Sequence, residues 1–313
     1  MDKSAKIFVA GHRGLVGSAF MRHFENRGYS DVVTHTRDEM DLFDQRAVLD
    51  FFRQTRPEYV IFAAGRVGGI VENKTYPGDF ITQNLEMQLN VFKAAREYEV
   101  SRLIFFGSSC MYPRECPQPM NEDQLLTGRP EQTSIAYAIA KLAGVQMSLS
   151  YNEQYGRRSF IPVIPNSVYG PNDNFDPASG HVLSALINRF HAAKEQGLDG
   201  VTLWGSGSPR REFLYADDLV SACMLLLDAN LEELQMPLNI GPGDDVSIKE
   251  LAQTIARVIG YQGAINWDTS KPDGTPRKLL DSSRMKALGW TPGTALEDGI
   301  RRTYEWYLKR PKQ

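Results

Sequence analysis

The sequence predicts an α/β protein: a Rossmann-type, doubly wound parallel sheet followed by a smaller C-terminal α/β domain. Three observations favour this fold class. In the first half, short β-branched or aromatic runs alternate with helical stretches, as in βαβ units. A glycine-rich segment directly follows the first of these runs. After Pro165 the regular alternation gives way to loop-rich segments, which indicates a change of domain.

The elements of the first half are predicted from hydrophobic periodicity. Strands are expected at 6–10, 31–34, 59–62, 102–106 and 160–164. Helices are expected near 15–27, 44–55, 80–98 and 134–155. Such an alternation places helices on both faces of a parallel sheet, with right-handed crossovers between the strands.

The second half contains fewer regular elements. A loop at 169–180 precedes a helix near 181–194 and a strand near 201–204, and a loop at 205–210 leads to 212–215 and a helix from Asp217. Ser247 and Glu250 form a capping box that opens a helix ending at Ile259. We therefore expect a nucleotide-binding domain over 1–170, to which 212–240 returns. A second domain over 171–313 would consist mainly of 171–211 and 241–313, and would bind the substrate.

Composition excludes several classes of protein. The chain has 313 residues, 42% of them hydrophobic and 23% charged, which is typical of a globular protein of about two domains. The net charge of −3 argues against a nucleic-acid partner. We expect no membrane association, because no apolar run approaches the roughly 18 residues of a membrane helix and the N-terminus does not resemble a signal peptide. The three cysteines have neither disulfide nor metal-site spacing, which favours the reducing cytoplasm.

Gly11, Gly14 and Gly17 form the pattern G-x-x-G-x-x-G directly after the first strand. Glycines allow a tight turn and let the backbone approach a pyrophosphate, and the first helical residues, Leu15 and Val16, offer free N–H groups. A plain strand-to-helix turn is the alternative. The strand, helix and βαβ context favours a dinucleotide site.

The end of the second strand favours NADP(H) as the cofactor. An acidic residue there commonly holds the ribose of NAD, but 33–37 contains none and ends in Arg37. Arg13 lies in the glycine loop, and two guanidinium groups suit a 2′-phosphate. Alternatively, both arginines are solvated surface residues. Asp41 either approaches the adenine or caps a helix.

Tyr137 and Lys141 are spaced i, i+4 within a helical stretch, so their side chains share one face. A nearby ammonium favours the phenolate and should lower the pKa of Tyr137 from about 10. Lys141 is also placed to hold the nicotinamide ribose. An exposed surface pair would be the usual outcome for this spacing alone. Ser108, which follows the fourth strand, strengthens the catalytic interpretation, because it is suited to hydrogen-bond a substrate carbonyl.

Two neighbours of Ser108 leave alternatives open. Ser109 either replaces it in contacting substrate or forms a local turn. Cys110 is either a small packed residue or a reactive group. Cys116 and Cys223 are interpreted as packed residues.

Several segments resemble the GDP-L-fucose synthase family of extended short-chain dehydrogenases/reductases. The matching segments are 11–18, 107–113, 137–141, 169–175, 211–214 and 271–278, and the resemblance runs from Ile7 to Trp306. The resemblance implies NADPH-dependent epimerisation at two carbons of GDP-4-keto-6-deoxy-mannose, followed by reduction of the 4-ketone. It also implies a cofactor contact at Ala63 and a homodimer built through the helices at 80–98 and 134–155.

The family's base–acid pair corresponds to Cys110 and His181. Inversion needs such a pair, because a single base tends to return the proton to the same face. A cation at His181 or Lys141 would favour the thiolate that a base requires. Otherwise His181 is a cap or surface residue.

Substrate contacts are expected from the second half of the chain. Arg189 and Arg211 suit the diphosphate, with Lys278 as a further candidate. Trp204 contacts the guanine or sugar end, or else is a core aromatic on a strand. The resemblance adds Ser109 and Asn166 as substrate-binding residues.

The sequence departs from the family pattern at two places. Residues 165–168 read Pro-Asn-Ser-Val where the family usually has Pro-Thr-Asn-Leu, and 63–69 read Ala-Ala-Gly-Arg-Val-Gly-Gly where it usually has Ala-Ala-Lys-Val-Gly-Gly. These changes leave open a related enzyme for another GDP-4-keto sugar, such as the colitose precursor. A non-catalytic NADP-binding module is disfavoured, because it has no need of Ser108, Tyr137 and Lys141.

Overall fold

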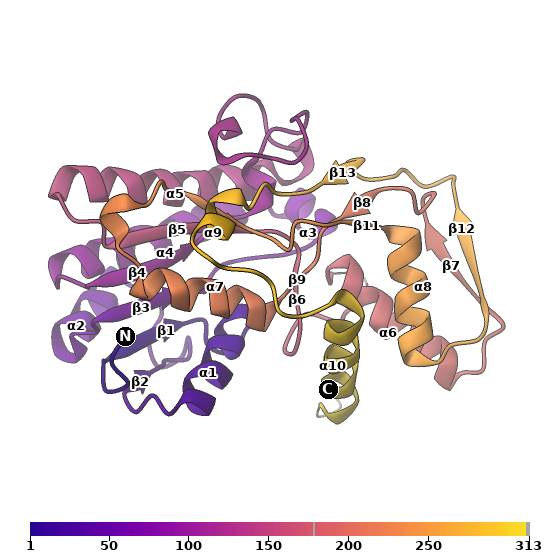
Figure 1. Cartoon of the computed structure of the whole chain (residues 1–313), viewed down its shortest axis with the longest axis horizontal. Coiled ribbons are helices and arrows are strands. Elements are labelled where there is room, and N and C mark those ends of the chain that lie inside the picture. The colour runs from indigo at the N-terminus through magenta and orange to yellow at the C-terminus, as the bar shows by residue number, and fades with distance from the viewer. Residues whose placement is uncertain (178, 311–313) are drawn as a thin grey trace.

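A computed structural model describes residues 1–177 and 179–310 as two lobes lying side by side (Figure 1). The first lobe is built on a six-stranded sheet whose neighbours all pair in parallel, in the order β10-β5-β4-β3-β1-β2. Its strands are β1 (Ile7–Ala10), β2 (Val32–Val33), β3 (Tyr59–Phe62), β4 (Arg102–Phe106), β5 (Phe160–Pro165) and β10 (Leu238–Ile240). The expected doubly wound sheet is confirmed. The strand order reverses between β1 and β3, and such a reversal is where open α/β sheets bind ligands.

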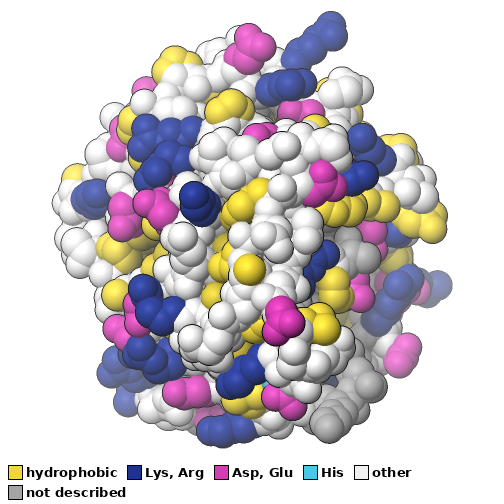
Figure 2. Space-filling model, turned by 90° about the vertical axis from the view of Figure 1, so that its right-hand side faces the viewer, with side chains coloured by type: hydrophobic (Ala, Val, Ile, Leu, Met, Phe, Trp, Pro, Cys, Tyr) yellow, Lys and Arg dark blue, Asp and Glu magenta, His cyan; other side chains and the backbone are white. Residues whose placement is uncertain are grey.

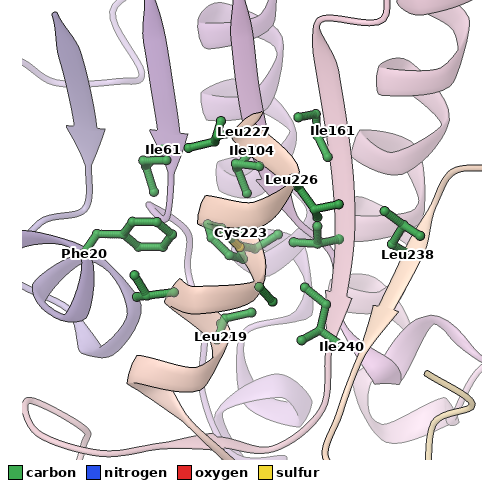
Figure 3. Packing of buried hydrophobic residues seen from close by; sticks show 14 of the residues in the cluster. Phe20, Ile61, Ile104, Ile161, Leu219, Cys223, Leu226, Leu227, Leu238 and Ile240 are labelled. Atoms are coloured by element: carbon green, nitrogen blue, oxygen red, sulfur yellow. The ribbon is translucent and has the colours of Figure 1, made fainter. Parts of the chain in front are cut away.

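Helices cover both faces of this sheet. They are α1 (Leu15–Arg27) and α7 (Ala216–Asp228) on one face, and α2 (Gln45–Thr55), α4 (Pro77–Glu97) and α5 (Ile135–Tyr155) on the other. Figure 3 shows Leu219, Cys223 and Leu226 of α7 packed against Ile104 and Ile161 of the central strands. Cys223 is completely buried there, which confirms that it is a packed residue.

The helix ends follow local capping chemistry. Asp44 caps α2, because its side chain accepts hydrogen bonds from the N–H groups of Arg46 and Ala47. The proposal that Asp41 caps a helix is therefore wrong, since Asp41 instead accepts a bond from the Phe43 N–H. The capping box of Ser247 and Glu250 is confirmed at the start of α8 (Ile248–Ile259).

The second lobe packs three helices around a core of its own. Its helices are α6 (Val182–Glu195), α8 (Ile248–Ile259) and α10 (Leu296–Lys309). Beside them lie the pair β7 (Gly200–Trp204) and β12 (Ala264–Asp268), the sheet of β11 (Val246–Ser247), β8 (Arg210–Arg211) and β13 (Arg277–Lys278), and the pair β6 (Val168–Tyr169) and β9 (Leu214–Tyr215). In Figure 1 the β11-β8-β13 sheet and the β6–β9 pair lie towards the middle of the molecule, whereas β7 and β12 lie at the outer end of the second lobe.

The chain crosses between the lobes more than once. Strand β10 pairs with β5 and α7 packs on the first sheet, so this part of 212–240 lies with the first lobe. A second return was not anticipated: Met285 of α9 (Ser283–Ala287) and Trp290 are buried in the same first-lobe core. Part of 241–313 therefore supports the first lobe instead of the second.

Several short elements were missed by the sequence prediction. They include α3 (Ile70–Thr75), β10, β12 and the short 3₁₀ turns. Strand β10 has only three residues, Leu-Asn-Ile, which is too short for a periodicity signal.

Within the described residues, no helix is both long and apolar enough to cross a membrane. On the face seen in Figure 2, acidic and basic side chains are mixed, in keeping with the small net charge of −3.

Candidate active site

The glycine loop between β1 and α1 is closed so tightly that side chains have no room. Gly11 has a φ of +84°, and a Cβ there would lie 2.7 Å from the backbone nitrogen of Ala64. A Cβ on Gly17 would collide with the carbonyl oxygen of Gly11. Helix α1 begins at Leu15 without a side-chain cap, so its first N–H groups remain available to an anion. The loop, with Ala63 beside it, forms the backbone cradle that a pyrophosphate requires.

The two arginines that suggested NADP(H) lie on the rim of the first lobe. Arg13 is exposed. Arg37 pairs with Asp41 at 3.4 Å and lies over the ring of Phe43, 5.0 Å from its centroid. Thr36 donates to the nearby Glu39 carboxylate through its N–H and its hydroxyl. These positions leave both guanidinium groups accessible to a phosphate.

Ser108, Tyr137 and Lys141 come together at the carboxyl edge of the sheet. Burial raises the pKa of Tyr137 well above 10, and a hydrogen bond with Ser108 acts in the opposite direction. Burial also lowers the pKa of Lys141 to about 8. The expectation that Lys141 lowers the pKa of Tyr137 is therefore wrong for the cofactor-free protein. The Lys141 ammonium lies over the rings of Phe105 and Tyr137, 5.1 and 5.9 Å from their centroids, and gives the phenolate too little compensation for burial.

Cys110 lies in a polar environment two residues beyond Ser108. Its N–H donates to the Ser108 hydroxyl at 3.2 Å, and its Sγ accepts from Lys278 Nζ at 3.9 Å. The charge of Cys110 also acts on Arg211, whose pKa is lowered by burial. Lys278 and Arg211 are thus cations beside Cys110 that the sequence did not single out for this role.

Cys116 differs from Cys110 in its surroundings. Its thiol donates to Gln124 Oε1 at 3.1 Å, and burial raises its pKa.

His181 is presented by a tight loop at the start of α6. A Cβ on Gly180 would collide with the carbonyl oxygen of Asn174, so the turn before His181 requires glycine. His181 occupies the N-cap position, but its side chain makes no capping hydrogen bond. Within residues 1–177 and 179–310, no hydrogen bond joins its ring to Cys110 or Tyr137.

Asp173 was missed by sequence reasoning, although it lies within the segment 169–175 that carried the resemblance. Its carboxylate accepts a hydrogen bond from Ser184. Burial raises the pKa of Asp173, and the hydrogen bond from Ser184 and the charge of His181 act in the opposite direction. A buried carboxylate therefore lies within electrostatic reach of His181.

The other substrate candidates gather on the second lobe. Arg189 on α6 donates to the Thr202 carbonyl of β7 at 3.3 Å. Trp204 ends the same strand and is 70% exposed, so the alternative of a core aromatic is wrong. Lys271 Nζ lies 5.7 Å from the centroid of the Trp204 ring. A cation and an exposed aromatic surface therefore lie near each other, as recognition of a nucleotide requires.

Asn166 and Glu212 form a buried polar junction between the lobes. Both are completely buried. Asn166 Nδ2 donates to Glu212 Oε2 at 2.9 Å and to the Lys278 carbonyl at 3.2 Å. Glu212, which sequence reasoning missed, also accepts from the N–H groups of Gly243 and Leu280 at 2.8 and 3.0 Å. Ser109, which directly precedes Cys110 in the chain, is also buried.

The second departure from the family pattern lies near Tyr137. Arg66 pairs with Asp79 at 3.2 Å and lies over the ring of Phe80. Phe80 in turn packs edge-on against Tyr137, with ring centroids 6.3 Å apart. Arg66 therefore contacts Phe80, and Phe80 contacts Tyr137, so that a change at residue 66 acts on the site through Phe80.

Fold and site together define a dinucleotide-dependent enzyme of the extended reductase class. The model of the NAD dependent epimerase/dehydratase family matches residues 7–241, and the chain belongs to this family.

The particular relatives are enzymes of GDP-sugars. The chain is 53% identical over 310 residues to GDP-L-fucose synthase 1 of Arabidopsis thaliana, covering 98% of this chain and 94% of that one. It is 34% identical to the GDP-L-colitose synthase of Yersinia pseudotuberculosis over 97% of this chain and 98% of that one. A similar solved structure is MlghC, a GDP-mannoheptose C4 reductase from Campylobacter jejuni with NADP bound, with a TM-score of 0.90, 36% identity and coverage of 99% and 100%.

Proposed function

We propose that this protein converts GDP-4-keto-6-deoxy-D-mannose to GDP-L-fucose by epimerisation and NADPH-dependent reduction of the 4-ketone. The observation that carries the proposal is the grouping of Ser108, Cys110, Tyr137 and Lys141 at one edge of the sheet. The 53% identity to a GDP-L-fucose synthase supports this substrate over the colitose precursor, whose synthase is 34% identical.

The cofactor site fits NADP(H). The cradle that Gly11 and Gly17 leave open suits the pyrophosphate, and Arg13 and Arg37 suit the 2′-phosphate. Asp41, which already orients Arg37, faces the adenosine end, and Ala63 and Lys141 face the nicotinamide end. Bound NADPH supplies the hydride for reduction at C4.

Reduction requires an acid that delivers one proton to the ketone oxygen. Ser108 and Tyr137 hold this oxygen by hydrogen bonds, and the raised pKa of Tyr137 keeps its proton in place until charge develops on the oxygen. The same two donors stabilise the enolate formed during epimerisation. Lys141 orients the ribose.

Epimerisation requires a base and an acid on opposite faces of the sugar ring. Cys110 follows β4 in the first lobe, and His181 begins α6 in the second. Cys110 removes the proton next to the ketone, and His181 returns one from the other face. Asp173, a buried carboxylate within electrostatic reach of His181, is placed to orient this group. A substrate lying between the lobes would meet both groups, in keeping with the lack of a hydrogen bond between them in the described residues.

The second lobe recognises the GDP portion. Arg189 and Arg211 bind the diphosphate, and Trp204 offers its exposed ring to the guanine. Ser109 lies on the sugar side, whereas Asn166 is completely buried and supports the site through Glu212 and Lys278. In this division, 1–170 with 212–240 forms the cofactor domain and 171–211 with 241–313 mainly forms the substrate domain.

We also propose a cytoplasmic homodimer. Leu89 on α4 and Ile139 on α5 are each 41% exposed, although leucine and isoleucine favour burial. These two helices pack against each other, so their outer faces are suited to pair with a second copy. All three cysteines are free, in keeping with a reducing compartment.

The test is to identify the products made from GDP-4-keto-6-deoxy-mannose and NADPH in heavy water by NMR. The unmodified protein should yield GDP-L-fucose carrying deuterium at the inverted carbons. Cys110→Ser should yield mainly an unepimerised, reduced sugar, because the hydroxyl is a much poorer base while Tyr137 and Lys141 remain. His181→Asn should block inversion while it permits exchange on the face that Cys110 serves.

Cys116→Ser is the matched control and should behave like the unmodified protein. Normal exchange and normal product from Cys110→Ser would reject Cys110 as the base. A 3,6-dideoxy preference, with no turnover of the 6-deoxy substrate, would favour the colitose-type enzyme.

A further inference from the structure

We infer that Lys278, in hydrogen-bond contact with the sulfur of Cys110, positions this sulfur to accept a proton. This inference rests on the proposed function of Cys110 as the base. Lys278 Nζ donates to Cys110 Sγ at 3.9 Å across 168 residues of sequence. Lys278 was a further candidate for the diphosphate, after Arg189 and Arg211. The structure instead directs its ammonium to the sulfur, and Lys278 acts through Cys110 as a positioning residue.

Three segments fix the backbone of Lys278 in this place. Strand β13 pairs with β8, with Lys278 opposite Arg211. The Lys278 carbonyl accepts from Asn166 Nδ2 at 3.2 Å. Glu212 then joins Asn166 to the N–H of Leu280, two residues beyond Lys278. Because Asn166 and Glu212 are completely buried, this junction holds the strand rigidly beside Cys110.

The charge of Lys278 is not claimed by another side chain. A small cavity beside Cys110 is lined by charged residues that already have partners: Arg114 pairs with Glu131 at 3.5 Å, and Arg277 pairs with Asp245. In the described part of the chain, no carboxylate forms an ion pair with Lys278.

Two further residues, Arg211 and Tyr137, interact electrostatically with the sulfur. Arg211 donates to its neighbour's carbonyl at 2.7 Å and reaches Cys110 by charge alone. Tyr137, which also interacts with Cys110 electrostatically, is neutral near pH 7 because its pKa is raised. Lys278 is therefore the cation in hydrogen-bond contact with the sulfur.

The chemical step balances without a further reagent. The sulfur anion takes a proton from the carbon next to the ketone, so that an S–H bond forms and the C–H bond breaks. The electron pair moves to the ketone oxygen, which Ser108 and Tyr137 hold. Lys278 keeps its proton throughout. A nearby cation favours the ionised form of an acid, and the experiment below measures whether Lys278 does so for this thiol.

The experiment measures how fast iodoacetamide alkylates Cys110 in the cofactor-free protein between pH 5.5 and 9.5, by peptide mass spectrometry. In Lys278→Met, the midpoint of the rate profile should rise by at least about one pH unit, and the rate at pH 7 should fall by about tenfold or more. Lys278→Arg should recover part of the loss. Lys249→Met, which removes an exposed lysine from α8, is the matched control and should leave the profile unchanged.

GDP affinity, measured on the same variants, separates the two roles of Lys278. A changed alkylation profile with GDP affinity within about twofold supports the inference. An unchanged profile with weakened GDP binding would overturn it and return Lys278 to the diphosphate. If Lys278→Met does not fold, Lys278→Gln is judged by the same midpoint. This readout does not require turnover, so it stands apart from the product test of Cys110→Ser.

Discussion

The glycine loop and the surroundings of Cys110 show two ways of building a binding region. The loop is made by one continuous segment, and its shape comes from backbone conformation at Gly11 and Gly17. The surroundings of Cys110 are assembled from side chains far apart in sequence, with Lys278 and Arg211 brought in by the pairing of β13 with β8. A local region can be predicted from a motif, whereas an assembled one depends on strand register.

Tyr137→Phe should give the largest effect, because Tyr137 serves both regions. The ring and its packing on Phe80 remain, but the proton donor is lost. We expect reduction of the 4-ketone to slow by about 10²–10⁴-fold, while Cys110 still catalyses proton exchange at a diminished rate. Stopped-flow absorbance of NADPH and exchange followed by NMR measure the two steps separately. Reduction at a near-normal rate would show that another group supplies the proton.

A double variant in which alanine replaces both Arg13 and Arg37 tests the cofactor region at the glycine loop alone. Loss of the guanidinium–phosphate bonds should lower kcat/KM for NADPH by about ten- to a hundredfold, with little change for NADH. GDP affinity should be unaffected, because both residues lie on the first lobe. Arg53→Ala, at an exposed position on α2, is the control. Equal use of NADH and NADPH by the unmodified protein would remove the basis for this assignment.

Much of the first lobe could be predicted because its signals are local. The bounds of β3, β4 and α1 agree with the expected ones, and the glycine spacing led directly to the cradle. Ser108 and the Tyr137–Lys141 pair were also found, since one follows a recognisable strand and the others share a helical face.

What could not be predicted depends on burial and long-range pairing. Nothing in the sequence around Glu212 shows that its carboxylate collects three hydrogen bonds from separate segments. The hydrogen bond from Ser184 on α6 to Asp173, and the interaction of Asp173 with His181, depend in the same way on tertiary packing. The direction of the Tyr137 pKa was misjudged, because spacing on a helix reports proximity to Lys141 but not the desolvation of both groups.

The last prediction compares the two lysines, since Lys141 is buried in the first lobe while Lys278 remains half-buried beside the sulfur. Burial lowers the pKa of Lys141 from 10.5 to about 8. Between these pH values the unfolded chain binds more protons than the folded protein, so the free energy of unfolding should rise with pH through this term. Relative to Lys141→Met, the free energy of unfolding of the unmodified, cofactor-free protein should rise by about 2 kcal/mol between pH 7 and pH 10.

Taking the difference between the two proteins cancels the opposing effect of tyrosines that ionise in the unfolded chain near pH 10. Urea unfolding at pH 7, 8, 9 and 10 gives both curves. Parallel curves would mean that Lys141 carries no desolvation cost, and that its ammonium finds a partner in solution that its place over Phe105 and Tyr137 does not supply.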